Sequence, residues 1–190
     1  MNRIAHMGLP VNNKTQLLAR FVTTIDHWTL KTGHTIAWLL VLMVFIQSLV
    51  VILRYGFEVG SIALQESVTY LHAICFMLGI AYTLKMDGHV RVDIFYRRFT
   101  PQKKALINLL GSLCFLLPLC LLIFTTSFQY VLQAWQVKEQ SQDSGGLPIV
   151  YLLKTLIPLL ATGLLLQALA EMGRSILTLL ANNSEAKAEH

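Results

Sequence analysis

Four long stretches of the sequence are almost free of charged residues, and polar segments separate them. They run over residues 35–53, 67–84, 105–137 and 148–172. The first two contain 19 and 18 consecutive uncharged positions, which is about the length that an α-helix needs to cross a hydrocarbon core of about 30 Å. In the last stretch, Lys154 lies close enough to the start for its side chain to reach water. The pattern predicts four transmembrane helices.

The third stretch is too long for a simple span. Residues 105–137 would form a straight helix of about 50 Å, which exceeds the hydrocarbon core by many ångströms. Proline at position 118 removes a backbone N–H and crowds the preceding turn. We therefore predict that this helix tilts strongly, kinks near Pro118 or extends beyond the lipid.

The two ends of the chain differ from the spans. Residues 14–31 place apolar side chains at helical spacing between charged ones, which is typical of an amphipathic helix in the headgroup plane. The C-terminal residues 182–190 form a polar tail. The apolar positions of the N-terminal segment are Leu17, Phe21, Ile25 and Trp28.

Composition supports lipid as the solvent of this chain. Hydrophobic residues make up 55% of the sequence and charged residues only 13%, about half of the charged fraction of a typical soluble domain. The net charge is +5, but no basic stretch carries the interleaved aromatic residues of a nucleic-acid platform. The sequence thus predicts a single all-α integral membrane domain over residues 1–190, in contact with lipid and not with nucleic acid.

The distribution of basic residues predicts the orientation. The leader, the link between the second and third spans and the C-terminal tail carry four, six and two Lys or Arg residues, whereas the other side of the membrane would carry only Arg54, Lys138 and Lys154. Basic loops stay in the cytoplasm. Both termini are therefore predicted to be cytoplasmic.

Charged residues at the span ends have two interpretations that do not exclude each other. Arg54 follows the first span and Glu66 precedes the second, so each suits the dipole of its helix. The same residues, with Glu58, could also pair with one another or with a partner subunit.

A dense polar segment follows the second span. In residues 85–95, His89, Arg91 and Asp93 alternate with apolar residues, and Gly88 is expected to end the preceding helix by taking a positive φ. A solvated loop explains the polar residues, but their apolar neighbours favour a segment that lies against protein or lipid.

No catalytic, cofactor-binding or metal-binding site is predicted. A serine nucleophile elbow, paired catalytic carboxylates and a phosphate-binding glycine loop are all missing from the sequence. His34 and His72 raise the alternative of a haem- or quinone-associated anchor of a redox enzyme. Haem ligation requires both rings at one depth, whereas the predicted topology separates these two residues by much of the bilayer.

Three parts of the sequence together resemble the small membrane subunit of TRAP transporters, the DctQ type. The first is Glu66 at the opening of the second span, and the most specific is the run of residues 79–95. The third comprises Trp135, residues 139–148 and residues 154–158, and it is similar to the branch linked to uptake of α-keto acids and related carboxylates. The resemblance covers roughly residues 35–175.

The resemblance implies a function that composition cannot show. Members act in the bacterial inner membrane as scaffold and docking subunits of importers of organic acids, coupled to an ion such as sodium. A large multi-spanning permease holds the transport sites, and a periplasmic substrate-binding protein delivers the substrate. The residues that we expect at the partner interface are Arg54, Glu66, Lys85, His89, Arg91, Asp93, Trp135, Glu139 and Lys154.

Overall fold

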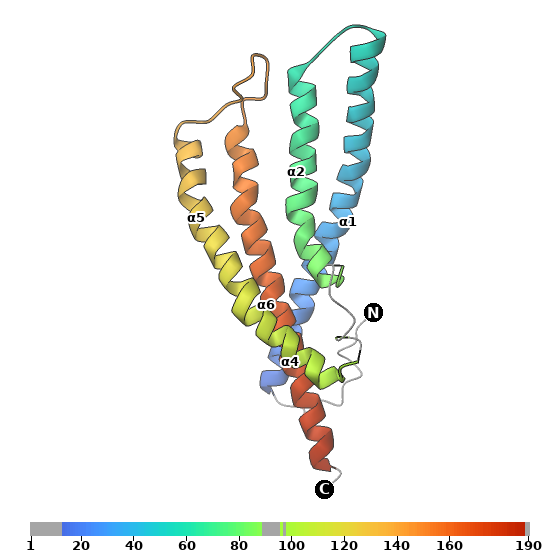
Figure 1. Ribbon diagram of the computed structural model, residues 1–190, viewed down its shortest axis with the longest axis vertical. Helices are drawn as coiled ribbons and strands as arrows, with labels where there is room; N and C mark the ends of the chain where they lie inside the picture. The colour runs from blue at the N-terminus through green and yellow to red at the C-terminus, as the bar shows by residue number, and fades with distance from the viewer. Residues whose placement is uncertain (1–12, 89–95, 97, 189–190) are drawn as a thin grey trace.

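The structure, a computed structural model, consists of two helical hairpins packed side by side (Figure 1). It describes residues 13–88, 96 and 98–188, with side chains up to residue 181. Four helices in this part of the chain are long and apolar enough to cross a membrane, as the sequence predicted. The α1–α2 and α5–α6 loops lie at one end of the bundle, which we call the loop end. The start of α1, the end of α2, the start of α4 and the end of α6 lie toward the other, which we call the terminal end.

The first helix, α1, is one continuous helix over Asn13–Gly56. Residues 14–31, expected as an interfacial helix, are helical and continue without a break into the first span. Their position at the membrane interface stays a prediction. Val22, in the N-terminal half, is fully buried. A Cβ on Gly173 of α6 would lie 2.9 Å from Val22. This half of α1 therefore packs on α6.

The second helix, α2, spans Ile62–Lys85 and has a defined cap at each end. Ser61 has extended backbone geometry, and its Oγ accepts a hydrogen bond from the Leu64 N–H at 3.4 Å, which satisfies one of the free donors of the first turn. At the other end Asp87 adopts φ 57°, and the Gly88 N–H donates to the Thr83 carbonyl at 2.9 Å. The left-handed residue is thus Asp87 and not Gly88, because an aspartate tolerates this geometry better than most side chains.

The third span is built from three consecutive segments. It comprises α4 (Pro101–Gly111), a π-helical turn (Ser112–Leu116) and α5 (Leu117–Gln136). The Leu117 N–H bonds to the carbonyl of Ser112, five residues earlier. Pro118 follows at once, and its missing N–H and bulky ring disfavour a regular α-helical turn here. The irregularity predicted near Pro118 is this π-helical turn, and the span runs obliquely across α6 (Figure 1).

The last helix, α6, spans Val150–Ala188 and contacts α1, α2, α4 and α5. Its buried positions include many small residues, which let neighbouring backbones approach closely in a membrane, where packing replaces the hydrophobic effect. The helix continues without a break into the predicted polar tail. The small residues of α6 with at most 1% exposure are Ala161, Ala168 and Ala170.

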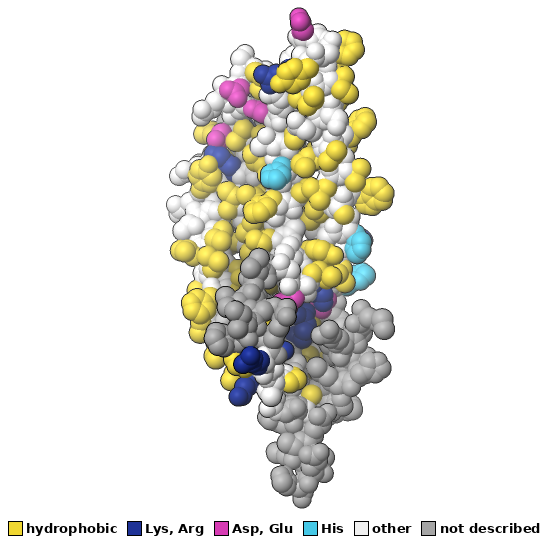
Figure 2. All heavy atoms as spheres, turned by 45° about the vertical axis from the view of Figure 1, so that its right-hand side comes forward, with side chains coloured by type: hydrophobic (Ala, Val, Ile, Leu, Met, Phe, Trp, Pro, Cys, Tyr) yellow, Lys and Arg dark blue, Asp and Glu magenta, His cyan; other side chains and the backbone are white. Residues whose placement is uncertain are grey.

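The outer surface has the distribution expected of a membrane protein. Trp38 and Phe45 of α1 and Phe115 of the π-helical turn are each at least 68% exposed. On the face shown in Figure 2, acidic and basic side chains lie toward the two ends, and hydrophobic and uncharged side chains, apart from histidine, cover the middle.

Candidate functional site: two polar layers

Asp26 is the centre of a charged cluster at the terminal end of the bundle. Its carboxylate forms an ion pair with Lys85, the last residue of α2. It also accepts two hydrogen bonds from Arg174 Nη2 of α6, at 2.9 and 3.1 Å. All three side chains are at most 27% exposed. One carboxylate of α1 therefore holds both α2 and α6.

Two further residues of α6 complete this cluster. Glu171 pairs with Arg174 one turn away, so that the cluster contains two cations and two anions. Gln167 is fully buried, accepts from Thr29 Oγ1 at 2.9 Å and donates to Asp26 at 3.4 Å. A buried amide is tolerated when its polar atoms are satisfied in this way. We call Asp26, Thr29, Lys85, Gln167, Glu171 and Arg174 the lower polar layer.

Glu66 organises the loop end. It lies in the second turn of α2, and its carboxylate accepts hydrogen bonds from the Ser141 hydroxyl and, at 2.6 Å, from the Leu147 N–H. Both donors belong to the α5–α6 loop, where the Ser141 N–H also bonds to the Leu147 carbonyl at 3.1 Å. Glu66 thus connects one hairpin to the loop of the other.

The neighbouring residues form a second set of contacts at the same end. Lys154 Nζ lies 2.6 Å from Glu139 Oε1 and 4.1 Å from the centre of the Tyr130 ring. Trp135 donates from Nε1 to Thr155 Oγ1 at 2.9 Å. These contacts hold α5 to α6. We call Glu66, Tyr130, Trp135, Glu139, Ser141, Lys154 and Thr155 the upper polar layer.

The two layers are separated by the thickness of a membrane core. Glu66 and Lys85 lie at opposite ends of α2. At about 1.5 Å per residue, their positions are about 28 Å apart along the helix axis, close to the hydrocarbon thickness of about 30 Å. The spacing of the two layers therefore matches the thickness of a hydrocarbon core, and both layers hold parts of the chain together.

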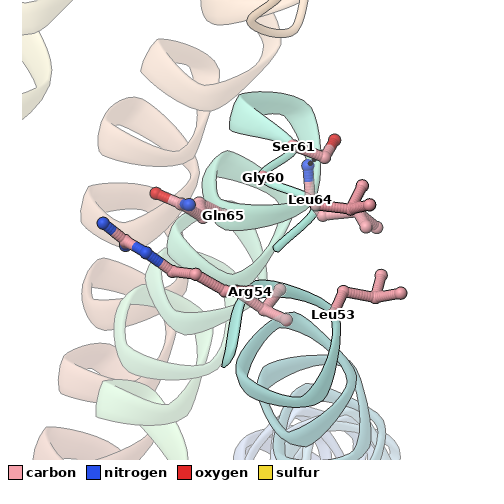
Figure 3. A pocket seen from close by; sticks show the side chains of 8 residues that line it. Leu53, Arg54, Gly60, Ser61, Leu64 and Gln65 are labelled. Atoms are coloured by element: carbon pink, nitrogen blue, oxygen red, sulfur yellow. Dashed lines mark hydrogen bonds between the residues drawn. The ribbon is translucent and has the colours of Figure 1, made fainter. Parts of the chain in front are cut away.

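Arg54 differs from the other expected interface residues that the structure describes. It is exposed near the end of α1, and it forms no hydrogen bond or ion pair within the described part of the chain. Figure 3 shows its side chain extended to the same side as that of Gln65 of α2. The arrangement leaves its guanidinium available to a group outside this chain.

The remaining expected interface residues have two outcomes. Five of them, Glu66, Lys85, Trp135, Glu139 and Lys154, have partners inside the chain. His89, Arg91 and Asp93 lie outside the described residues. A role of any of these residues at a partner interface stays a prediction.

Sequence reasoning missed the cluster around Asp26. The sequence pattern singled out none of Asp26, Gln167 and Arg174 as site residues. A signal was available, since Gln167 is an amide within the last apolar stretch and a polar group in a span requires a partner. Its partner on α1 could not be identified without the packing.

The histidines of the haem alternative lie closer in depth than expected. Cys75 Sγ is 3.9 Å from the carbonyl oxygen of Ile36, so these positions are level. His72 and His34 are then roughly 8 Å apart along the helix axes, and the expectation that much of the bilayer separates them is wrong. His72 instead stacks on Phe76 at 6.5 Å, and His34 Nδ1 lies 2.7 Å from the Leu30 carbonyl oxygen. Within the described residues, no observation favours a haem between them.

Four apolar helices between two polar layers define a multi-spanning helical membrane protein. Residues 40–178, most of the chain, match the family model described as "Tripartite ATP-independent periplasmic transporters, DctQ component". The chain therefore belongs to the DctQ family, as the resemblance indicated. Comparisons with curated proteins and with solved structures give no match.

Family membership places the chain among transport components. It is the small component of a TRAP transporter of the bacterial inner membrane and not an enzyme. Such a component works together with a large permease and a periplasmic binding protein. The narrower assignment to uptake of α-keto acids stays a prediction.

Proposed function

We propose that this chain is the scaffold and docking subunit of a sodium-coupled importer of organic acids, whose transport sites lie in the large permease. The main support is the placement of its charges. Between the two polar layers the four spans contain no Asp or Glu, and the charged side chains of the layers are largely paired with one another. A path for an ion or an organic anion would require partners at mid-depth.

The docking role follows from the remaining surface. The apolar exterior of the helices can pack against the permease, and Arg54 and the polar ends can set the register of that contact. The sequences of the two hairpins are not alike, so they give no sign of the inverted repeat that forms alternating gates in a stand-alone transporter.

Reconstitution tests this function. Proteoliposomes with this chain, the large permease and the binding protein should accumulate a labelled organic acid under an inward sodium gradient, with a panel of mono- and dicarboxylates as candidate substrates. Omission of any one component should abolish uptake. Uptake by this chain alone, or full uptake without it, would refute the proposal.

The orientation is a separate prediction that rests on the charge distribution. We propose that the terminal end faces the cytoplasm and the loop end the periplasm. Reporter fusions at residues 60 and 142 should give periplasmic signals, and fusions at residues 98 and 185 cytoplasmic ones. A cytoplasmic signal at residue 142 would contradict this topology.

A further inference from the structure

An apolar groove lies where α1, α2 and α6 diverge. Its volume is about 260 Å³, and residues of all three helices line it, among them Trp28, Ala81 and Gly163. Along α1 it extends from Ile25 to Thr32, a length of about 10 Å. It thus begins beside Asp26, at the lower polar layer, and reaches into the apolar part of the bundle.

The lining of the groove is mostly apolar. The groove contains only two hydroxyl groups, those of Thr29 and Thr32. Thr29 donates to Gln167, and Thr32 donates to the Trp28 carbonyl at 3.0 Å. The groove is therefore suited to hydrocarbon, and a dry void of this size would leave its lining atoms without contacts.

A cation lies beside the groove. Lys31 Nζ is 5.7 Å from the centre of the Trp28 ring, and Trp28 itself lines the groove. Lys31 is exposed and forms no ion pair within the described residues. Its ammonium group is therefore available to an external anion. Lys85 and Arg174 of the lower polar layer are less available, because each already pairs with a carboxylate.

We propose that this groove binds one phospholipid of the bilayer, with an acyl chain along α1 and α6 and an anionic headgroup beside Lys31. The lining and the charge support this occupant, since an apolar surface suits an acyl chain and Lys31 beside Trp28 offers a cation for the headgroup. A spanning helix of a partner fits less well, because the groove is only about two helical turns long. The bound lipid would fill the space where α1 separates from α6.

Tryptophan fluorescence can test this proposal directly. The chain has three Trp residues, so Trp38→Phe and Trp135→Phe leave Trp28 as the only indole. The protein is placed in vesicles of brominated phosphatidylglycerol or brominated phosphatidylcholine, whose bromine atoms quench indole on contact. We expect the anionic lipid to bind beside Trp28 about fivefold more strongly than the zwitterionic one, as read from the quenching. This is the ratio that one lysine provides near an anionic surface.

Three variants separate the proposed site from ordinary lipid contact. Lys31→Gln should abolish the selectivity, and Gly163→Leu, which fills the groove, should reduce quenching of Trp28 by both lipids. A protein with Trp38 alone, 76% exposed on α1, should show no selectivity. Equal quenching of Trp28 by the two lipids, or selectivity unchanged in Lys31→Gln, would overturn the proposal. Loss of the Trp28 quenching in the complex with the large permease would also overturn it, because the permease would then fill the groove.

Discussion

Replacement of Asp26 by alanine should destabilise the bundle by about 2–3 kcal/mol. Removal of one member of a buried ion pair typically costs about 3–5 kcal/mol, because the other member stays unpaired, and partial exposure reduces this figure here. In Asp26→Ala, Lys85 and Arg174 lose a shared carboxylate, so α1 loses its polar link to both α2 and α6. We expect a melting temperature lower by about 5–10 °C.

Thiol accessibility offers a suitable measurement. Cys75 and Cys120 are buried, whereas Cys114 is exposed, so in a Cys114→Ser background a thiol-reactive dye reports unfolding on heating. Asp143→Ala is the control, because this aspartate is exposed at the opposite end and such a change typically stays within about 0.5 kcal/mol. The double variant with Arg174→Ala should lose less than the sum of the single variants. Equal effects of Asp26→Ala and Asp143→Ala would show that the cluster does not hold the helices.

Gly146→Ala should displace the α5–α6 loop from α2. A Cβ at position 146 would lie 2.8 Å from Glu66 Oε1 and still closer to the side chain of Ser141. Either the loop backbone or Glu66 must move, so the contact that joins the two hairpins is strained or broken. The expected cost is about 1–3 kcal/mol, as for other overpacked sites. Limited proteolysis within residues 137–149 should become faster than in the unaltered protein.

The other interhelical loop provides the matched control. Gly60 belongs to the α1–α2 loop at the same end, and a Cβ there would have no neighbour within 4 Å, so Gly60→Ala should leave proteolysis unchanged. Glu66→Gln and Glu66→Ala form a graded series, because an amide keeps one acceptor oxygen and alanine none. Protection of the α5–α6 loop from proteolysis should therefore be lower in Glu66→Gln than in the unaltered protein, and lowest in Glu66→Ala. Protection that persists in Glu66→Ala would mean that the loop is held by other contacts.

The polar layers give the small component a mechanical property that suits a scaffold. Each layer joins segments that are distant in sequence. Asp26 of α1 contacts Arg174 of α6 below, and Glu66 of α2 contacts Leu147 of the α5–α6 loop above. A helix held near both ends, as α2 is by Lys85 below and Glu66 above, resists sliding. Any shift along its axis separates charged or hydrogen-bonded groups in an environment with few alternatives. We expect such a rigid surface to support a permease that changes conformation.

The sequence by itself determined the features that depend on composition along one helix. The absence of charge over residues 35–53 and 67–84 is sufficient for a span, because an unpaired charge in lipid is costly at any position of the bundle. The irregularity near Pro118 was also predictable, since a missing N–H disturbs the turn regardless of neighbours. The three sequence blocks around Glu66, residues 79–95 and Trp135 were enough to indicate the family.

Only the tertiary structure decided which polar groups meet. Asp26 and Arg174 are 148 positions apart, and the register of α1 on α6 brings them together. The same packing holds residues 14–31 in one helix with the first span, against their local amphipathic pattern. It also brings Glu66 to a backbone N–H of a distant loop. These contacts depend on helix rotation and relative height, which side-chain packing between helices sets and which no single segment of the sequence specifies.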